Sequence, residues 1–164
     1  MASGDERAQA PQGLSGEGLR IAVVQARWNA EIIERLAAGV ERGLHDLGVT
    51  DIDWVSVPGS FEIPLAAKVV AKSGRIDAVV CIGAVIRGET THYEIVSEAA
   101  ADGILESQLE TGVPIAIGFV TVENHEQALA RSEGAGGHNV GEESALVAVE
   151  MARLCQAWAP TPGL

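Results

Sequence analysis

The sequence AVVCIGAVIRGETTH spans residues 78–92 and joins an apolar run to a polar turn. Its first half is continuously apolar and β-branched, without polar alternation, which is typical of a parallel strand covered by helices on both faces. A helical pattern begins a few residues after Gly88 and runs from Tyr93 to Glu110. The stretch therefore predicts a central parallel strand whose carboxyl end, the ligand-binding edge of open α/β sheets, carries polar side chains and a histidine.

The turn after this strand has the features of an anion site. Gly88 lets the backbone approach a ligand, and the amides of Glu89 and Thr90 would point outward at a helix start, where unpaired N–H groups favour an anion. His92 follows, and an imidazole can both take and give a proton near neutral pH. The turn alone leaves a plainer alternative open, in which a threonine caps the helix and His92 is an exposed residue of its first turn.

Strands and helices alternate on both sides of this stretch. Strands are predicted at 19–26, 53–57, 78–86 and 114–120, and helices at 30–47, 61–73, 93–110, 124–131 and 141–157. Ser60 is a candidate N-cap of the second helix. Such alternation implies a parallel sheet with right-handed crossovers. We predict an α/β fold of the flavodoxin-like kind, a three-layer sandwich with a central four-stranded parallel sheet.

The chain length of 164 residues fits one domain. Residues 1–18 are small, polar and rich in glycine, so they predict a disordered N-terminal arm. The folded domain is predicted at 19–158, and residues 159–164 are expected to form a frayed C-terminus. No internal repeat or linker divides the domain.

Composition excludes several classes of function. The net charge of −12 and pI near 4.6 argue against nucleic acid or an acidic membrane surface as a partner. No apolar run approaches the roughly 20 residues that span a bilayer, and no secretory signal is evident. Cys81 and Cys155 form no disulfide framework, so a cytoplasmic location is expected. The spacing of His45, His125 and His138 predicts no metal site, and no nucleophile elbow is present.

Three motifs in a fixed order resemble one enzyme family. They read VPGSFEIP at 57–64, GAVIRGETTHY at 83–93 and TVENHEQA at 121–128. With these motifs, residues 19–154 are similar to 6,7-dimethyl-8-ribityllumazine synthases, which catalyse the penultimate step of riboflavin biosynthesis. The resemblance implies a transferase that condenses 5-amino-6-ribitylamino-uracil with 3,4-dihydroxy-2-butanone 4-phosphate, releasing phosphate and water. It implies no cofactor, because the chemistry needs two positioned substrates and one mobile proton.

The same resemblance implies roles for individual residues. His92 would shuttle the proton, while the Glu89 and Thr90 amides, with Arg131 from an adjacent subunit, would hold the phosphate. Trp28 would stack on the pyrimidine ring. The other implied substrate-binding residues are Ser60, Phe61, Glu62, Ala84, Val85, Ile86 and Ile117.

Three of these side chains also have a plainer interpretation when the residues are considered alone. Arg131 would be a surface arginine paired with Glu133, and Trp28 would be a core aromatic residue. Glu62 would stabilise the first turn of its helix, a role compatible with substrate binding.

The chain departs from the family pattern at two positions and in one loop. Val140 stands where many members have lysine, and Ile117 stands where phenylalanine commonly lines the pyrimidine pocket. The loop between Arg131 and Gly141 is one residue longer than usual. Because this loop lies near the segment that governs shell closure in the family, the resemblance favours a homopentamer over its multiples.

Two other functions remain open at this stage. One is a weakly active or inactive paralogue whose main role is to assemble a shell. The other is a flavodoxin-like binding or receiver module, but a receiver needs aspartates after the first strand, where residues 25–28 supply none. Residues 14–19 could add a strand to a neighbouring subunit, as family members often do.

Overall fold

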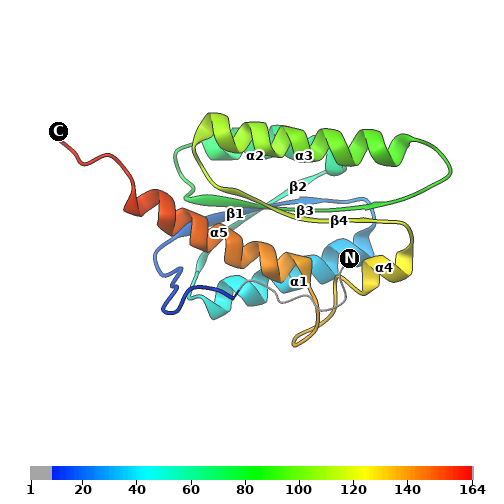
Figure 1. The fold of residues 1–164 in the computed structure, drawn as a ribbon, viewed down its shortest axis with the longest axis horizontal. Coiled ribbons are helices and arrows are strands. Elements are labelled where there is room, and N and C mark those ends of the chain that lie inside the picture. Colours follow the sequence, from blue (N-terminus) through cyan, green and yellow to red (C-terminus); the bar gives the residue numbers. More distant parts are fainter. Residues whose placement is uncertain (1–8, 164) are drawn as a thin grey trace.

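The computed structural model describes residues 9–163, and its centre is a four-stranded sheet in the order β2-β1-β3-β4. All three strand pairs are parallel (Figure 1). The strands are β1 (Arg20–Ala26), β2 (Asp51–Val57), β3 (Ala78–Ile86) and β4 (Ile115–Val122). The stretch at 78–86 is thus an inner strand, as predicted, and its carboxyl end shares one edge of the sheet with the ends of the other three.

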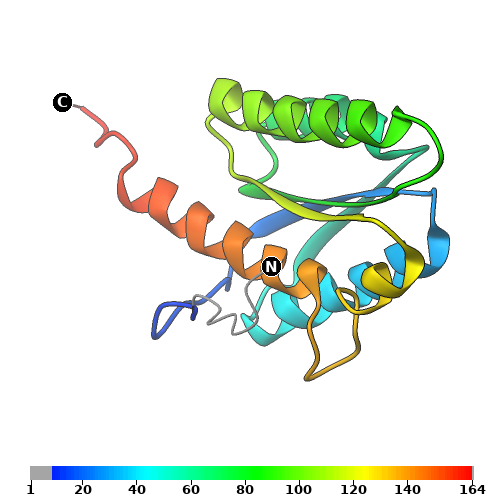
Figure 2. The same ribbon diagram turned by 45° about the vertical axis from the view of Figure 1, so that its right-hand side comes forward.

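Helices cover both faces of this sheet. On one face α2 (Ile63–Lys72) packs beside α3 (His92–Thr111). On the other face α1 (Ala30–Asp46) packs beside α5 (Val140–Ala157), and α4 (His125–Leu129) lies next to α1 (Figure 1). The turned view shows the same three layers, with the chain after α5 leading away from the sheet (Figure 2). The predicted three-layer, flavodoxin-like α/β fold is confirmed.

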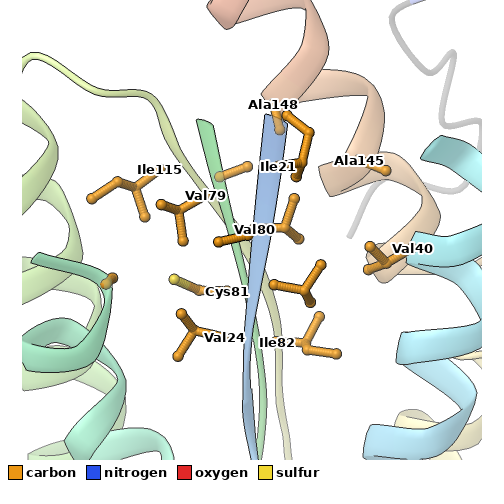
Figure 3. Close-up of a cluster of buried hydrophobic side chains, with 14 of the residues drawn as sticks. Ile21, Val24, Val40, Val79, Val80, Cys81, Ile82, Ile115, Ala145 and Ala148 are labelled. Atoms are coloured by element: carbon orange, nitrogen blue, oxygen red, sulfur yellow. The ribbon is translucent and has the colours of Figure 1, made fainter. Parts of the chain in front are cut away.

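β3 runs through the middle of the core. Residues 78–85 of this strand are buried without interruption. Side chains alternate between the layers, so that Val79 and Cys81 point toward α2 and α3 while Ile82 points toward α1 and α5 (Figure 3). Burial raises the pKa of the Cys81 thiol well above its ordinary value, so this side chain packs as a neutral, small apolar group.

The second helix begins differently from the prediction. Residues Ser60–Glu62 form a short 3-10 turn, and α2 starts only at Ile63. The prediction that Ser60 is the N-cap was wrong, because Gly59 holds that position for the turn and neither helix start has a side-chain cap. Pro64 lies in the first turn of α2, where its missing N–H removes one of the donors that a cap would satisfy.

Residues 1–8 of the predicted N-terminal arm lie outside the described residues. The part at 9–18 contains no helix or strand and contacts the domain through its backbone. Gly16 N donates to Leu47 O at 2.7 Å, and Arg153 donates to Ser15 O at 2.8 Å and to Glu17 O at 2.7 Å. Within residues 9–163, no helix combines the length and apolar character needed to cross a membrane.

Candidate active site

The turns that follow β1 and β2 enclose a pocket of about 610 Å³ together with the end of β3 and the start of α3. Eight of the predicted site residues line it: Trp28, Ser60, Phe61, Glu62, Ala84, Val85, Ile86 and His92. Four further lining residues were not predicted: Asn29, Gly59, Ile95 and Val96. The volume is that of a small-molecule site, and the place is the carboxyl edge of the sheet, as expected for an open α/β fold.

Two aromatic side chains stand at the mouth of the pocket. Trp28 is 74% exposed and Phe61 is 58% exposed, so the interpretation of Trp28 as a core residue was wrong. The loops that carry them are tied together, because Trp28 N donates to Pro58 O at 3.3 Å and Arg27 N to Val57 O at 3.0 Å. The indole therefore presents a flat apolar face on a fixed backbone, which suits stacking of a heterocycle.

Asn29 links the first helix to the central strand. Its backbone is left-handed, with φ 61° and ψ 50°, and it is the one non-glycine residue in that region among residues 9–163. Its side-chain Nδ2 donates to Ala84 O at 2.9 Å. This side chain therefore fixes the exit of β1, including Trp28, against the end of β3.

Replacing Asn29 with alanine is expected to destabilise the fold more than replacing it with glycine. Alanine forfeits the hydrogen bond, about 1 kcal/mol, and disfavours the left-handed backbone by about another 1–2 kcal/mol. Glycine loses the same bond but adopts this backbone freely. Denaturant unfolding of the two variants measures the difference, and equal losses would show that the backbone conformation carries no cost.

Ser60, which lines the pocket, packs closely against Gly83 of β3. A Cβ on Gly83 would lie 2.7 Å from Ser60 Oγ and 3.0 Å from the Phe119 ring, so only glycine allows these side chains to lie against β3. Ser60 is buried. The Glu62 carboxylate lies close to Gly59, since a Cβ there would be 3.2 Å from Glu62 Oε2. A buried serine and an exposed glutamate thus supply hydroxyl and carboxylate groups to the lining of a pocket with an aromatic mouth.

The turn at 88–91 borders the pocket between Ile86 and His92. The amides of Glu89 and Thr90 donate to no other group within residues 9–163, and a Cβ on Gly88 would meet nothing within 4 Å. Thr90 Oγ1 accepts from His92 N at 3.3 Å, so part of the plainer alternative holds as well. His92 is exposed and is the first residue of α3. The turn therefore leaves free donors and open space beside an accessible imidazole.

Four predicted residues do not line this pocket: Glu89 and Thr90 belong to the adjoining turn, whereas Arg131 and Ile117 lie elsewhere. Arg131 follows α4, where its Nη1 donates to Gln127 O at 3.0 Å, and the alternative that pairs it with Glu133 was wrong for the described residues. Ile117 is 47% exposed on β4 and lines a separate depression of about 300 Å³ with residues that include Phe119. The described lining of the main pocket contains no lysine or arginine.

Comparisons with known proteins match the whole of this region. A family model described as 6,7-dimethyl-8-ribityllumazine synthase matches residues 18–156, which include every pocket residue. A 6,7-dimethyl-8-ribityllumazine synthase from Kineococcus radiotolerans is 45% identical over 150 residues, or 91% of this chain and 92% of that protein. A chloroplastic 6,7-dimethyl-8-ribityllumazine synthase from Arabidopsis thaliana is 48% identical over 143 residues, or 86% of this chain and 63% of that protein.

Proposed function

The chain belongs to the 6,7-dimethyl-8-ribityllumazine synthase family, and we infer that it is a transferase of riboflavin biosynthesis. Its reaction condenses 5-amino-6-ribitylamino-uracil with 3,4-dihydroxy-2-butanone 4-phosphate. The products are 6,7-dimethyl-8-ribityllumazine, phosphate and water. The observation that carries this function is that the free amides of Glu89 and Thr90 lie in the turn between Ile86 and His92, both of which line one pocket with an aromatic mouth.

We propose that the pyrimidine and its ribityl chain occupy the pocket. The ring stacks on the exposed Trp28 indole and meets the backbone at Val85 and Ile86. The ribityl hydroxyls hydrogen-bond to Ser60 and Glu62, which supply polar groups to the pocket lining. Burial of the ring and pairing of the hydroxyls together orient the amino group for attack.

The four-carbon phosphate substrate is proposed to lie at the turn. Its phosphate accepts hydrogen bonds from the amides of Glu89 and Thr90, and the open space at Gly88 allows it to approach. The amino group attacks the carbonyl to give an imine, phosphate leaves, and the ring closes. His92 takes and returns the proton that these steps move, because its imidazole is exposed beside both binding regions.

A phosphate in this acidic chain needs a cation, and the pocket lining offers none. We propose that a second copy of the chain supplies Arg131, whose planar guanidinium can grip phosphate with two hydrogen bonds. Ile117 of the same neighbour closes the pyrimidine side. Both residues lie outside the pocket of their own chain, and exposed apolar side chains such as Leu65 and Leu109 provide surface for a partner. A ring of five copies is the proposed assembly.

Val140 hydrogen-bonds to the backbone of Arg131. It is the first residue of α5, and its N–H donates to Arg131 O at 2.9 Å. The lysine common at this position would place a second cation beside Arg131, so valine leaves the proposed phosphate site with one donated positive charge. A lower affinity for the phosphate substrate follows from this change.

The proposal is tested by mixing the purified protein with both substrates and measuring its mass in solution. Formation of product with its lumazine absorbance, by a particle of five subunits, is the expected result. An intact oligomer without product would instead support the shell-forming alternative. A monomer that forms product at the full rate would contradict the shared site.

We also propose a reducing compartment, such as the cytoplasm, as the location of this enzyme. Both cysteines are free thiols, Cys81 in the core and Cys155 on the surface. Disulfides are rare in such a compartment, where thiols stay reduced.

A further inference from the structure

Arg87 connects three elements at the edge of the sheet beside the pocket. It directly follows β3, and its backbone N–H donates to Val122 O at 2.8 Å, which continues the pairing with β4. Its Nη1 pairs with Glu94 in the first turn of α3, and its Nε lies 2.8 Å from Glu123 Oε2 just after β4. The guanidinium also stacks over Tyr93, with Cζ 4.2 Å from the ring centroid.

These contacts occupy the groups with which Arg87 would otherwise bind phosphate. Two of its nitrogens face carboxylates and its flat face lies on an aromatic ring. One cation between Glu94 and Glu123 leaves this cluster with a net negative charge, which repels an anion. The hydrogen bonds that Arg87 donates to Glu94 first, and then to Glu123, raise the pKa of Arg87, so the guanidinium stays charged at all working pH values. Arg87 is therefore a structural partner of the turn.

The pair of Arg87 and Glu94 closes the turn that carries the proposed phosphate site. Residues 88–93 lie between the two partners, and one hydrogen bond within this segment of the described chain runs from His92 N to Thr90 Oγ1 at 3.3 Å. The second carboxylate oxygen of Glu94, Oε2, is buried and accepts no hydrogen bond within residues 9–163. The Glu94 carboxylate therefore depends on Arg87 for its compensation.

We propose that Arg87 is a positioning residue that holds the turn at 88–91 and the imidazole of His92 in their binding geometry. It does so by fixing the start of α3 to the ends of β3 and β4. We call the contacts of Arg87 with Glu94, Glu123 and Tyr93 the brace. Since the amides of Glu89 and Thr90 have no other partner, the brace keeps them available to a ligand. The inference rests on the proposed phosphate site at that turn.

The test uses the full-length enzyme with Arg87→Met, which keeps a side chain of similar length without its charge or donors. Arg87→Lys keeps the charge but presents it as a point that cannot serve two carboxylates and a ring at once. Arg20→Met is the matched control, because Arg20 also pairs with a carboxylate, Asp77 at 3.3 Å, but at the opposite edge of the sheet. All variants are first compared with the parent in mass and thermal unfolding.

We expect Arg87→Met to raise the KM for the four-carbon phosphate and to lower kcat, each by about 10- to 100-fold, because a small displacement of a positioned group has effects of this size. The KM for the pyrimidine should change by less than about twofold, since Trp28 and the β3 backbone remain in place. Arg87→Lys should be intermediate and Arg20→Met should match the parent. An equal rise in both KM values, or no rise in either, would overturn the proposal.

A second variant separates positioning from simple charge. Changing Arg87→Met together with Glu94→Gln and Glu123→Gln removes the brace without leaving unpaired carboxylates. The phosphate defect should persist in this triple variant. Recovery of the parental KM would show that the single variant merely repelled the phosphate, and the positioning role would be rejected.

Amide hydrogen exchange supplies a readout that does not require catalysis. Peptides that cover residues 88–93 should exchange faster in Arg87→Met than in the parent, and Arg20→Met should leave them unchanged. Unchanged exchange in Arg87→Met would contradict the brace. If the parent makes no lumazine but the turn loosens as expected, the proposed function fails while the structural role of Arg87 stands.

Discussion

Replacement of His92 by alanine is expected to lower kcat by about 10²- to 10⁴-fold, the usual contribution of a positioned acid–base group. The side chain lies on the rim of the pocket at the first position of α3, and it is exposed, so its loss removes no core packing. The KM values should change little by comparison. Steady-state assays with both substrates measure the split between kcat and KM.

His125→Ala is the control for this variant. His125 lies in the first turn of α4, 3.3 Å from Glu31, and does not line the pocket. It should keep the parental kcat, and both variants should keep the parental mass. Parental turnover in His92→Ala would remove His92 from the mechanism, while loss of the oligomer would show a folding defect instead.

Co-assembly of two impaired variants should restore activity if neighbouring chains share each site. His92→Ala retains the donated arginine, and Arg131→Ala retains an intact pocket. Refolding them together in equal amounts should restore about a quarter of the parental sites, because each site takes its pocket and its arginine from different copies across a head-to-tail contact. Activity is compared with that of each variant refolded alone.

The outcome depends on Arg131 lying outside the pocket of its own chain. If the mixture is no more active than its components, the arginine acts within one chain or not at all. Arg131→Ala alone should raise the KM for the phosphate substrate more than that for the pyrimidine, because the lost contact is to phosphate. Equal rises in the two would indicate misfolding. Arg35→Ala, on α1, provides a control for loss of an arginine.

The central strand and its turn were predictable because their signals are local. An unbroken apolar run marks β3, and the change from Arg87-Gly88 to a helical pattern marks the site edge. Patterns along the chain also gave the alternation that defines the three layers. The exact starts of elements were less accessible, as Ser60 shows, because Pro64 made a side-chain cap at that helix unnecessary.

Contacts between distant residues were the part that local patterns could not supply. Asn29 hydrogen-bonds to Ala84, which lies 55 positions later in the sequence. Its left-handed backbone has no signal in the sequence other than the residue type, asparagine. The structural role of Arg87 could not be predicted, because one of its partners, Glu123, follows a different strand, β4. The placement of Ile117 and Arg131 on substrate remains a prediction, since one chain does not bring them to its pocket.

The strand order has a consequence for how the enzyme forms. β1 pairs with β3, which lies beyond α1, β2 and α2 in the sequence, so this contact closes a long loop. Such non-local pairings cost chain entropy before they gain stability, and they slow folding. The cavity borders β3 and the loop that follows β1, so it cannot exist in the newly made chain until that pairing is complete. Substrate can therefore bind folded chains, but it cannot guide the folding of chains in which β1 and β3 are not yet paired.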